Sequence, residues 1–378
     1  MKIILYRLFL VVFSLGIGAL LFVAMIYAGD KSKGPLEDLF VKINSAISGF
    51  EKEMITAEDS RASSLKWFSR YRNNVSLLNA PDTVFFGAYD DQTINSFKNI
   101  VTLEDSLGFQ LPIIQIYSAW GSKVDQNFPL LRAEAIYDLG SVPMITWEPW
   151  LDDFDPEEYP FAAKDGNINE GGLKAISQGL FDEYIDNWAL DVKEFRHPLF
   201  LRFAHEMNDP YRYPWGPQNN SPEEFKAAWN YLADRFDSIG VSNVIWVWSP
   251  HPAYPYTDYF PERNVDWIGI TALNYGTVAP WSQWWTFDET FSKCYNELSG
   301  YNIPFMITEF ASLGVGGDRP KWYYDALKSV PEKYPLVHAM LFFHAAKDNT
   351  TTYKSLDWTL WNDQPTIEKI NEALDTWK

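Results

Sequence analysis

The chain has 378 residues and a formal net charge of −19 at pH 7, and aromatic residues make up 17% of it. Nucleic-acid binding depends on basic groups that neutralise phosphates, so this acidic balance excludes nucleic acid as an expected partner. The single cysteine, Cys294, excludes an internal disulfide and any zinc site built from several cysteines. Aromatic rings stack on the apolar faces of sugars, so the composition suits a protein that binds a neutral carbohydrate.

The N-terminal segment Leu8–Ala28 contains no charged residue. Its length fits a membrane-spanning helix, which needs about 20 apolar residues, better than the shorter apolar region of a signal peptide. We therefore expect residues 1–28 to be an uncleaved single-pass anchor in the cell membrane, with the rest of the chain outside the cytoplasm. Secretion after signal cleavage is the alternative. Apolar residues at helical spacing over Leu36–Met54 predict a helix. We expect residues 29–78 to form a short juxtamembrane stalk, and a helix packed on the main domain is the alternative for Leu36–Met54.

From residue 79 onward, short apolar runs alternate with longer helical patterns, which is typical of βα units. Eight such runs are predicted as strands: Thr83–Ala88, Leu111–Ile116, Val142–Thr146, Pro198–Ala204, Asn243–Trp248, Val265–Thr271, Pro304–Thr308 and Val337–Phe342. The predicted helices are Thr93–Leu103, Leu130–Leu139, Gly172–Lys193, Pro222–Ile239, Phe287–Leu298, Lys321–Ser329 and Pro365–Trp377. The segment between the fifth and sixth strands shows no helical pattern and is predicted as a loop.

Eight strand–helix repeats predict a (β/α)8 TIM barrel, of the α/β class, as one catalytic domain over residues 79–378. A doubly wound sheet is the alternative, but no glycine-rich phosphate turn follows any predicted strand. In a barrel, all eight C-terminal strand ends lie on one face, where active sites of this fold are found. Polar and aromatic residues stand at these ends throughout the sequence, which predicts a functional site on that face.

Two carboxylates stand out at the strand ends, Glu206 after the fourth strand and Glu309 after the seventh. Glycoside hydrolysis needs such a pair, because one group protonates the leaving oxygen while the other attacks the sugar or activates water. The two carboxyl groups lie about 5–5.5 Å apart in retaining enzymes and about 6.5–9.5 Å apart in inverting ones. The structural alternatives are an ion pair of Glu206 with Arg202 or a nearby lysine, and a strand-end cap or ion pair for Glu309.

Three motifs together resemble glycoside hydrolase family 26: His205-Glu206-Met207-Asn208, Ile307-Thr308-Glu309 and Trp267-Ile268-Gly269. The resemblance extends over about residues 83–377. It implies a retaining (β/α)8 enzyme whose catalytic glutamates follow the fourth and seventh strands.

By this resemblance Glu206 is the acid/base and Glu309 the nucleophile, with His205, Asn208 and Tyr275 as catalytic supports. His205 would form a hydrogen bond near the sugar or the nucleophile. Tyr275 would donate a hydrogen bond to Glu309, which favours the charged form that a nucleophile needs. Because the acid must be protonated, we expect Glu206 to lie among apolar and aromatic groups.

Residues beside these positions are expected to bind the sugar chain: Tyr89, Trp120, Trp147, Glu148, Trp150, Trp215, Trp248 and Trp281. The Trp-Glu-Pro-Trp sequence that begins at Trp147 resembles family members that cut mixed-linkage β-1,3/1,4-glucan, whereas mannan-degrading members usually carry a histidine in this region. The resemblance thus implies a retaining endo-β-glycanase acting on mixed-linkage glucan, with β-1,4-mannan as the alternative substrate.

No metal or cofactor is expected. His205-Glu206 begins like the HExxH zinc motif, but the second histidine is missing because position 209 is Asp. The alternative of another class is a non-catalytic polysaccharide-binding or export-assembly protein built on a hydrolase scaffold, in complex with a polysaccharide synthase. A scaffold that has lost its activity usually lacks a catalytic carboxylate, and this chain keeps both.

Overall fold

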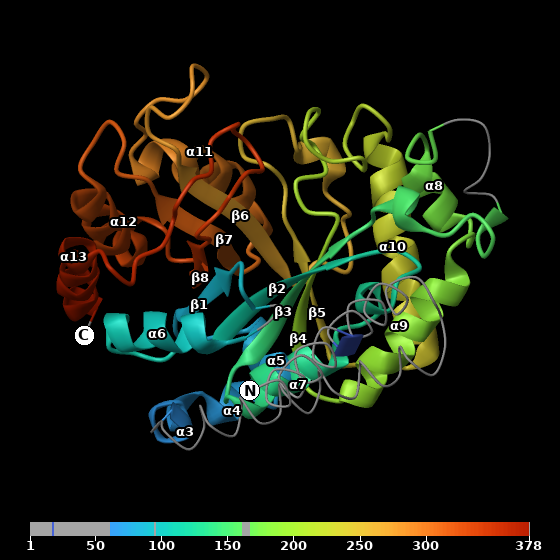
Figure 1. Ribbon diagram of the computed structural model, residues 1–378, viewed down its shortest axis with the longest axis horizontal. Coiled ribbons are helices and arrows are strands. Elements are labelled where there is room, and N and C mark those ends of the chain that lie inside the picture. The colour runs from blue at the N-terminus through green and yellow to red at the C-terminus, as the bar shows by residue number, and fades with distance from the viewer. Residues whose placement is uncertain (1–16, 19–60, 94–95, 161–166, 378) are drawn as a thin grey trace, which may run out of the picture. The chain divides into compact units, whose positions relative to one another are not determined.

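A computed structural model describes residues 17–18, 61–93, 96–160 and 167–377 of the chain. Eight parallel strands close into a barrel in chain order, and β8 pairs with β1 (Figure 1). The strands are β1 Phe85–Asp90, β2 Ile113–Ala119, β3 Val142–Glu148, β4 Leu199–Phe203, β5 Val244–Trp248, β6 Trp267–Asn274, β7 Phe305–Ser312 and β8 Val337–His344. The predicted barrel and its eight strands are confirmed. Most strands run further than predicted at their C-terminal ends, so that Glu148 and Glu309 lie inside strands.

Helices on the outside of the barrel cover the strands (Figure 1). They are α6 Lys98–Leu107, α7 Leu130–Asp138, α8 Gly172–Ser177, α9 Asp182–Phe195, α10 Pro222–Ile239, α11 Phe287–Leu298, α12 Arg319–Lys333 and α13 Gln364–Leu374. The predicted single helix Gly172–Lys193 is two helices, because Gly179 adopts a left-handed backbone with φ of 81° between them. Between β5 and β6, where no helix is predicted, the structure has only the 3-10 turn Thr257–Tyr259.

The N-terminal end of the barrel is closed by residues 61–79, which we call the plug. The plug contains the short helices α3 Arg61–Ser64, α4 Ser69–Arg72 and α5 Val75–Asn79. Its buried side chains pack against the first residues of the strands: Leu65, Phe68, Tyr71 and Leu78. The prediction that residues 29–78 form a stalk is therefore wrong for this part, which belongs to the same compact unit as the barrel. Burial of these apolar side chains is the physical reason.

A buried ion pair fastens the plug to the barrel. Arg61 donates to both oxygens of Glu104 in α6, from Nε at 2.9 Å and from Nη2 at 2.6 Å. Arg61 also donates to Ser141 Oγ and to the carbonyl oxygen of Leu139, and Glu104 accepts the backbone N–H of Leu111. Every charged group of this pair is thus satisfied by several partners, which a buried ion pair requires.

The predicted anchor, Leu8–Ala28, lies outside the described residues apart from Ile17 and Gly18, as does the predicted helical pattern Leu36–Met54. In the ranges that the structure describes, no helix combines the length and the apolar character that crossing a bilayer requires.

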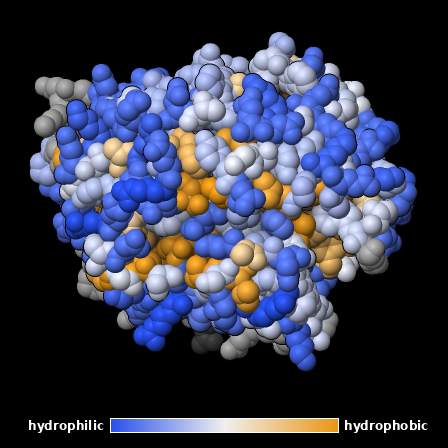
Figure 2. Space-filling view, turned by 180° about the vertical axis from the view of Figure 1, so that it is seen from behind, coloured by the Kyte–Doolittle hydropathy of each residue, from blue (hydrophilic) through white to orange (hydrophobic). Residues whose placement is uncertain are grey.

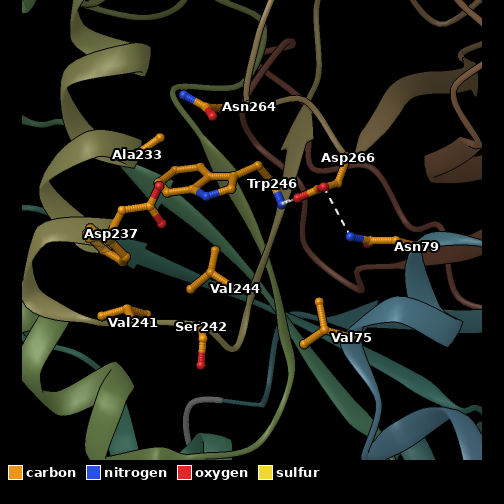
Figure 3. A pocket seen from close by; sticks show the side chains of 11 residues that line it. Val75, Asn79, Ala233, Asp237, Val241, Ser242, Val244, Trp246, Asn264 and Asp266 are labelled. Atoms are coloured by element: carbon orange, nitrogen blue, oxygen red, sulfur yellow. Dashed lines mark hydrogen bonds between the residues drawn. The ribbon is translucent and has the colours of Figure 1, made fainter.

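The face turned away from the viewer in Figure 1 is mostly hydrophilic, with hydrophobic side chains gathered in a band across its middle (Figure 2). Next to the plug, a pocket of about 250 Å³ opens between α5, the end of α10 and the first residues of β5 and β6 (Figure 3). Inside it Asp266 accepts hydrogen bonds from Asn79 at 3.0 Å and from the backbone N–H of Trp246 at 2.8 Å. Burial raises the pKa of Asp266. Because this pocket adjoins the N-terminal ends of β5 and β6, it lies away from the C-terminal strand ends that carry Glu206 and Glu309.

Candidate active site

The turn that follows β4 carries Glu206 in an unusual backbone conformation. Ala204 and Glu206 both have positive φ angles, 43° and 53°. Such left-handed backbone costs free energy for residues other than glycine and is concentrated at functional sites. The Glu206 N–H donates to the Ser249 carbonyl oxygen at 2.7 Å, and the Asp209 N–H donates to the Glu206 carbonyl oxygen at 2.9 Å. These bonds hold the turn in place at the C-terminal end of the barrel.

The carboxylate of Glu206 is buried and faces positive charge. Arg212, six residues further along the same loop, donates from Nη1 to Glu206 Oε2 at 3.2 Å. Burial alone would raise the pKa of Glu206, but His251, Arg212 and Arg202 together outweigh it, and the pKa lies below its ordinary value. The prediction that Glu206 lies among apolar groups that keep it protonated is therefore wrong for this conformation, because two arginines and a histidine surround it.

Glu309 in β7 is directed into the barrel by a β-bulge. Thr271 of β6 pairs with Glu309, whereas the preceding residue Ile270 pairs with Ile307, so Thr308 is an extra residue in β7. An extra residue shifts the alternation of side chains between the two faces of a strand. Ile307 faces outward, and strict alternation would place Glu309 on the same outward face. The extra residue turns Glu309 inward instead.

One oxygen of Glu309 is held by two donors. Tyr117 in β2 donates its hydroxyl to Oε1 at 2.9 Å, and Arg202 in β4 donates from Nη2 to the same oxygen at 2.8 Å. Arg202 is completely buried, and its Nε donates to Thr146 Oγ1 at 2.9 Å. Burial and the charge of Glu309 raise the pKa of Tyr117 well above its ordinary value, so the hydroxyl keeps its proton. Among the described residues Oε2 of Glu309 has no hydrogen-bond partner, which leaves it free to attack.

The predicted partner of Glu309, Tyr275, lies elsewhere. Its ring contacts the edges of Trp281 and Trp358, with centroids 5.3 and 5.0 Å away. Among the described residues, Tyr117 and Arg202 supply the hydrogen bonds to Glu309 and Tyr275 supplies none. The role predicted for Tyr275 is thus filled by residues on β2 and β4. Tyr275 instead lies near Arg212, whose charge opposes the rise that burial causes in the pKa of this tyrosine.

His205 connects the turn to the third strand. Its Nε2 shares a hydrogen bond of 3.0 Å with the Tyr213 hydroxyl, and its Nδ1 lies 3.8 Å from Glu148 Oε1. Burial, followed by the charges of Arg202 and Arg212, lowers the pKa of His205 well below its ordinary value, so the imidazole is neutral. Within the described residues Nδ1 has no hydrogen-bond partner. His205 therefore lies inside the predicted site, beside Glu148.

Glu148 is a third carboxyl group in this site. Trp150 donates from its indole Nε1 to Glu148 Oε2 at 3.1 Å. Burial is the main reason that the pKa of Glu148 is raised to about 7, and the negative charge of Glu309 adds to it. Glu148 thus changes its charge near neutral pH, one strand away from β4.

Asn208 supports the site through the backbone of the loop after β5. Its side chain donates to the carbonyl oxygens of His251 and Tyr254 at 2.9 and 3.2 Å and accepts the His251 N–H at 2.7 Å. Side-chain atoms of Glu206, Asp209 and His251 lie within 4.8 Å of one another. Because the Arg212 guanidinium already occupies Glu206 Oε2, we interpret this cluster as hydrogen-bonding and charged groups around a carboxylate. The expectation of a site without metal or cofactor stays a prediction.

Four of the tryptophans predicted to bind sugar are buried: Trp120, Trp147, Trp215 and Trp248. Trp147 lies on the outer face of β3 and stacks on Trp188 of α9 at 4.3 Å, and Trp248 lies on the outer face of β5. Alternate residues of a strand face opposite sides, so neighbours of inward-facing site residues pack against the helices. Trp147 and Trp248 therefore pack in the core between the barrel and its helices, and sugar binding by the four buried tryptophans stays a prediction. Trp215 instead donates from Nε1 to the His205 carbonyl oxygen and supports Tyr213 by stacking.

The remaining predicted sugar-binding residues reach the surface near the strand ends. Trp281 is the most open, with 60% of its surface exposed. Trp150 and Tyr89 are half-buried, and Tyr89 packs against Tyr117 with ring centroids 4.9 Å apart. Together with Glu148 they remain candidates for contact with a sugar.

The predicted site omits three residues that the structure brings to the carboxylates: Tyr117, Arg202 and Arg212. Arg202 carries a signal, since an arginine in an otherwise apolar strand needs a buried acid, but its partner is Glu309 and not Glu206. Tyr117 stands at a predicted strand end, where either face is possible. Arg212 lies in an aromatic loop, and nothing in its sequence context indicates a bond to Glu206.

Comparison with known proteins identifies relatives of the chain. The family model described as glycosyl hydrolase family 26 matches residues 168–297. Endoglucanase H from Acetivibrio thermocellus is 30% identical over 286 residues, which is 73% of this chain and 29% of that protein. A β-1,3-xylanase from Vibrio sp. is 24% identical over 140 residues, 34% of this chain and 29% of that protein. The chain thus spans less than a third of the length of these relatives.

Solved structures of similar fold include the catalytic domain of an endo-β-1,4-mannanase from Bacillus sp. JAMB-750, with a TM-score of 0.57 and 16% identity over 84% of this chain and 90% of that one. A family 26 β-mannanase from Bacteroides ovatus gives a TM-score of 0.56 and 18% identity over 78% and 89%. At such identities the likeness shows the barrel fold alone. The family model and the match to Endoglucanase H go further, and together they relate the chain to glycosyl hydrolase family 26.

Proposed function

We propose that the protein is a retaining endo-β-glycanase that hydrolyses mixed-linkage β-1,3/1,4-glucan by double displacement. The observation that carries the proposal is the state of Glu309, whose Oε1 is bound by Arg202 and Tyr117 while Oε2 is left without a partner among the described residues. A carboxylate fixed in this way through one oxygen, with the other oxygen free, is suited to attack a sugar.

The proposed reaction has two steps. In the first, Glu309 Oε2 bonds to the anomeric carbon as the bond to the leaving oxygen breaks, and protonated Glu206 gives its proton to that oxygen. In the second, ionised Glu206 removes a proton from water, the water oxygen bonds to the anomeric carbon and the bond to Glu309 breaks. Arg202 and Tyr117 hold Glu309 in position throughout, so that little reorganisation is needed.

The name of Endoglucanase H supports a glucan as substrate, as do Glu148 and Trp150 of the Trp-Glu-Pro-Trp sequence, which remain candidates for sugar contact. β-1,4-Mannan is the second candidate, because the similar solved structures include mannanases. A comparison of the wild-type protein on mixed-linkage glucan, mannan, β-1,3-xylan and cellulose tests this choice. Activity on mannan alone would overturn the preference for glucan.

The catalytic roles are tested by Glu206→Ala and Glu309→Ala, each of which we expect to lower kcat by at least about 10²–10⁴-fold. Circular dichroism would check that both variants remain folded. Glu332→Ala, at an exposed position of α12, is a control that should keep wild-type turnover. Turnover near the wild-type level in either site variant contradicts the assignment. NMR can identify the anomeric configuration of the sugar end that the enzyme releases first. Retention of the β configuration is expected, and release of the inverted anomer contradicts double displacement.

We also propose that residues 1–28 anchor the protein in the cell membrane with the catalytic domain outside the cytoplasm, and that it acts beside a polysaccharide synthase or export complex. The uncharged segment Leu8–Ala28 supports the anchor. Fractionation of cells, followed by protease treatment of intact spheroplasts, tests it. Recovery of the full-length protein from the cytosolic fraction would contradict it, and recovery of a shortened protein from the medium would favour signal cleavage.

A further inference from the structure

Arg212 joins the carboxylate of Glu206 to a loop on another part of the barrel. From Nη1 it donates to Glu206 Oε2 at 3.2 Å, and from Nη2 it donates to Thr350 Oγ1 at 3.1 Å. Thr350 belongs to the loop between β8 and α13, 138 residues further along the chain. Arg212 thus bridges the loop after β4 and the loop after β8 at the C-terminal end of the barrel.

Thr350, at the other end of this bridge, is held in place by hydrogen bonds within its own loop. Asp348 accepts the backbone N–H of Thr350 at 2.9 Å and its hydroxyl at 2.6 Å. The other oxygen of Asp348 accepts the indole N–H of Trp358 at 2.9 Å, and the backbones of Asp348 and Leu356 exchange two hydrogen bonds. Arg212 itself keeps 23% of its side chain exposed, so a ligand in the site can reach the guanidinium.

The bridge has a chemical consequence for Glu206. A general acid must carry a proton when the glycosidic bond breaks. The guanidinium of Arg212 is always charged and favours the ionised carboxylate. As long as the Arg212–Glu206 contact is closed, Glu206 is therefore held in the form that cannot donate a proton.

On the basis of the proposed function, we propose that Arg212 is a positioning residue that holds Glu206 ionised until substrate binds, and that a hydroxyl group of the leaving-group sugar draws the guanidinium away. Glu206 then takes a proton from solvent and gives it to the glycosidic oxygen. Thr350 limits how far Arg212 moves, because its hydroxyl is held by Asp348.

Groups other than Arg212 also influence the charge state of Glu206. The titratable and charged groups around it are Arg202 and His205 on the β4 side, Asp209, Arg212 and Tyr213 in the same loop, His251 and Tyr254 after β5, Tyr275 after β6, Glu309 in β7 and Glu148 in β3. Among the described residues, Arg212 is the cation in direct hydrogen-bond contact with Glu206, so its removal tests the bridge separately from the other groups.

The pH dependence of kcat/KM tests the proposal. Its alkaline limb reports loss of the proton from the acid in the free enzyme. Arg212→Gln removes the charge, so we expect its alkaline limb to move to higher pH. Arg212→Lys keeps the charge and should stay closer to the wild-type limb. Thr350→Val removes the anchor with little change in volume, and its limb should lie between those of the wild type and Arg212→Gln. An alkaline limb that stays at the wild-type pH in Arg212→Gln would overturn the proposal.

A second measurement needs no turnover. The Glu206 carboxyl can be titrated by NMR of ¹³C-labelled protein, with Glu206→Gln identifying its signal. We expect Arg212→Gln to raise the pKa that this signal reports, since a neighbouring positive charge is removed. An unchanged titration of Glu206 would overturn the bridge even in an active enzyme. Failure of the proposed function shows itself differently, as a wild-type protein that turns over none of the β-glycans.

Discussion

The two ends of the barrel each contain a buried ion pair between an arginine and a glutamate, and the two pairs are built differently. In the pair at the plug, Arg61 binds both carboxylate oxygens of Glu104, and the pair has further partners in Ser141 and in the backbone of Leu111 and Leu139. In the pair at the C-terminal end, Arg202 and Tyr117 share one oxygen of Glu309, and Arg202 Nη1 has no partner among the described residues. The first pair is saturated and serves stability. The second pair is incomplete, because Oε2 of Glu309 has no partner among the described residues and is available for the proposed attack on the sugar.

The largest effect is expected at the saturated pair. Arg61→Ala leaves Glu104 buried without its counter-charge, which should lower the free energy of unfolding by about 3–5 kcal/mol. Arg70→Ala is the matched control, because Arg70 pairs with Asp82 in the same plug but both side chains are largely exposed. Exposed pairs contribute little, so this control should unfold like the wild type. Urea unfolding measures both. Equal losses in the two variants would show that burial does not distinguish the pairs.

The second effect has the opposite sign and lies at the C-terminal end. The raised pKa of Glu148, about 7, means that the folded protein holds this proton to a higher pH than the unfolded chain. Its contribution to stability is therefore complete below the ordinary glutamate pKa and is lost as the pH rises to about 7. The loss amounts to about 3 kcal/mol, since each pKa unit corresponds to about 1.4 kcal/mol.

Glu148→Gln does not titrate and should escape this loss. Relative to the wild type, we expect the variant to gain about 3 kcal/mol in the free energy of unfolding between about pH 4 and pH 8. Urea unfolding across this range measures the difference, and Glu332→Gln on the exposed surface of α12 should show no such trend. Parallel pH profiles for the wild type and Glu148→Gln would contradict a raised pKa of Glu148 in the folded protein.

The smallest effect concerns the backbone before Glu206. Ala204 has a φ of 43°, which costs about 1–2 kcal/mol for a residue with a Cβ atom. Glycine avoids this cost but loses about 0.5–1 kcal/mol through the entropy of the unfolded chain. Ala204→Gly should therefore stabilise the protein by about 0.5–1 kcal/mol. Ala272→Gly, in the middle of β6, has no positive φ to relieve and should destabilise it by about 1 kcal/mol. Destabilisation in both variants would argue against strain in the turn.

The barrel could be predicted from the sequence because its signal is repeated. Eight apolar runs with helical patterns between them agree with one another, and a mistake over one element, such as the break at Gly179, does not alter the fold. The two glutamates could be predicted for a related reason. Glu206 and Glu309 follow the fourth and seventh runs, and the topology of a barrel brings all such ends to one face.

The partners of the glutamates could not be predicted, because they depend on which face of a strand each residue occupies. A bulge at Thr308 determines the direction of Glu309, and no residue type in that strand indicates that a bulge is present. Trp147 and Glu148 are neighbours in sequence but lie on opposite faces of β3. Residues 61–79 could not be separated from the predicted stalk, because their apolar side chains are buried by strands that lie far away in the sequence.

The plug also bears on the order in which the protein folds during synthesis. It is made before any strand of the barrel, yet its cluster of buried side chains includes Ala339 and Leu341 of the last strand. Its docking surface is therefore incomplete until β8 has left the ribosome. At a synthesis rate of about 5–20 residues per second, Phe68 and its apolar neighbours remain exposed for tens of seconds. A nascent chain of this design therefore has its greatest need for a chaperone at the plug, which is made before the barrel but packs only after it.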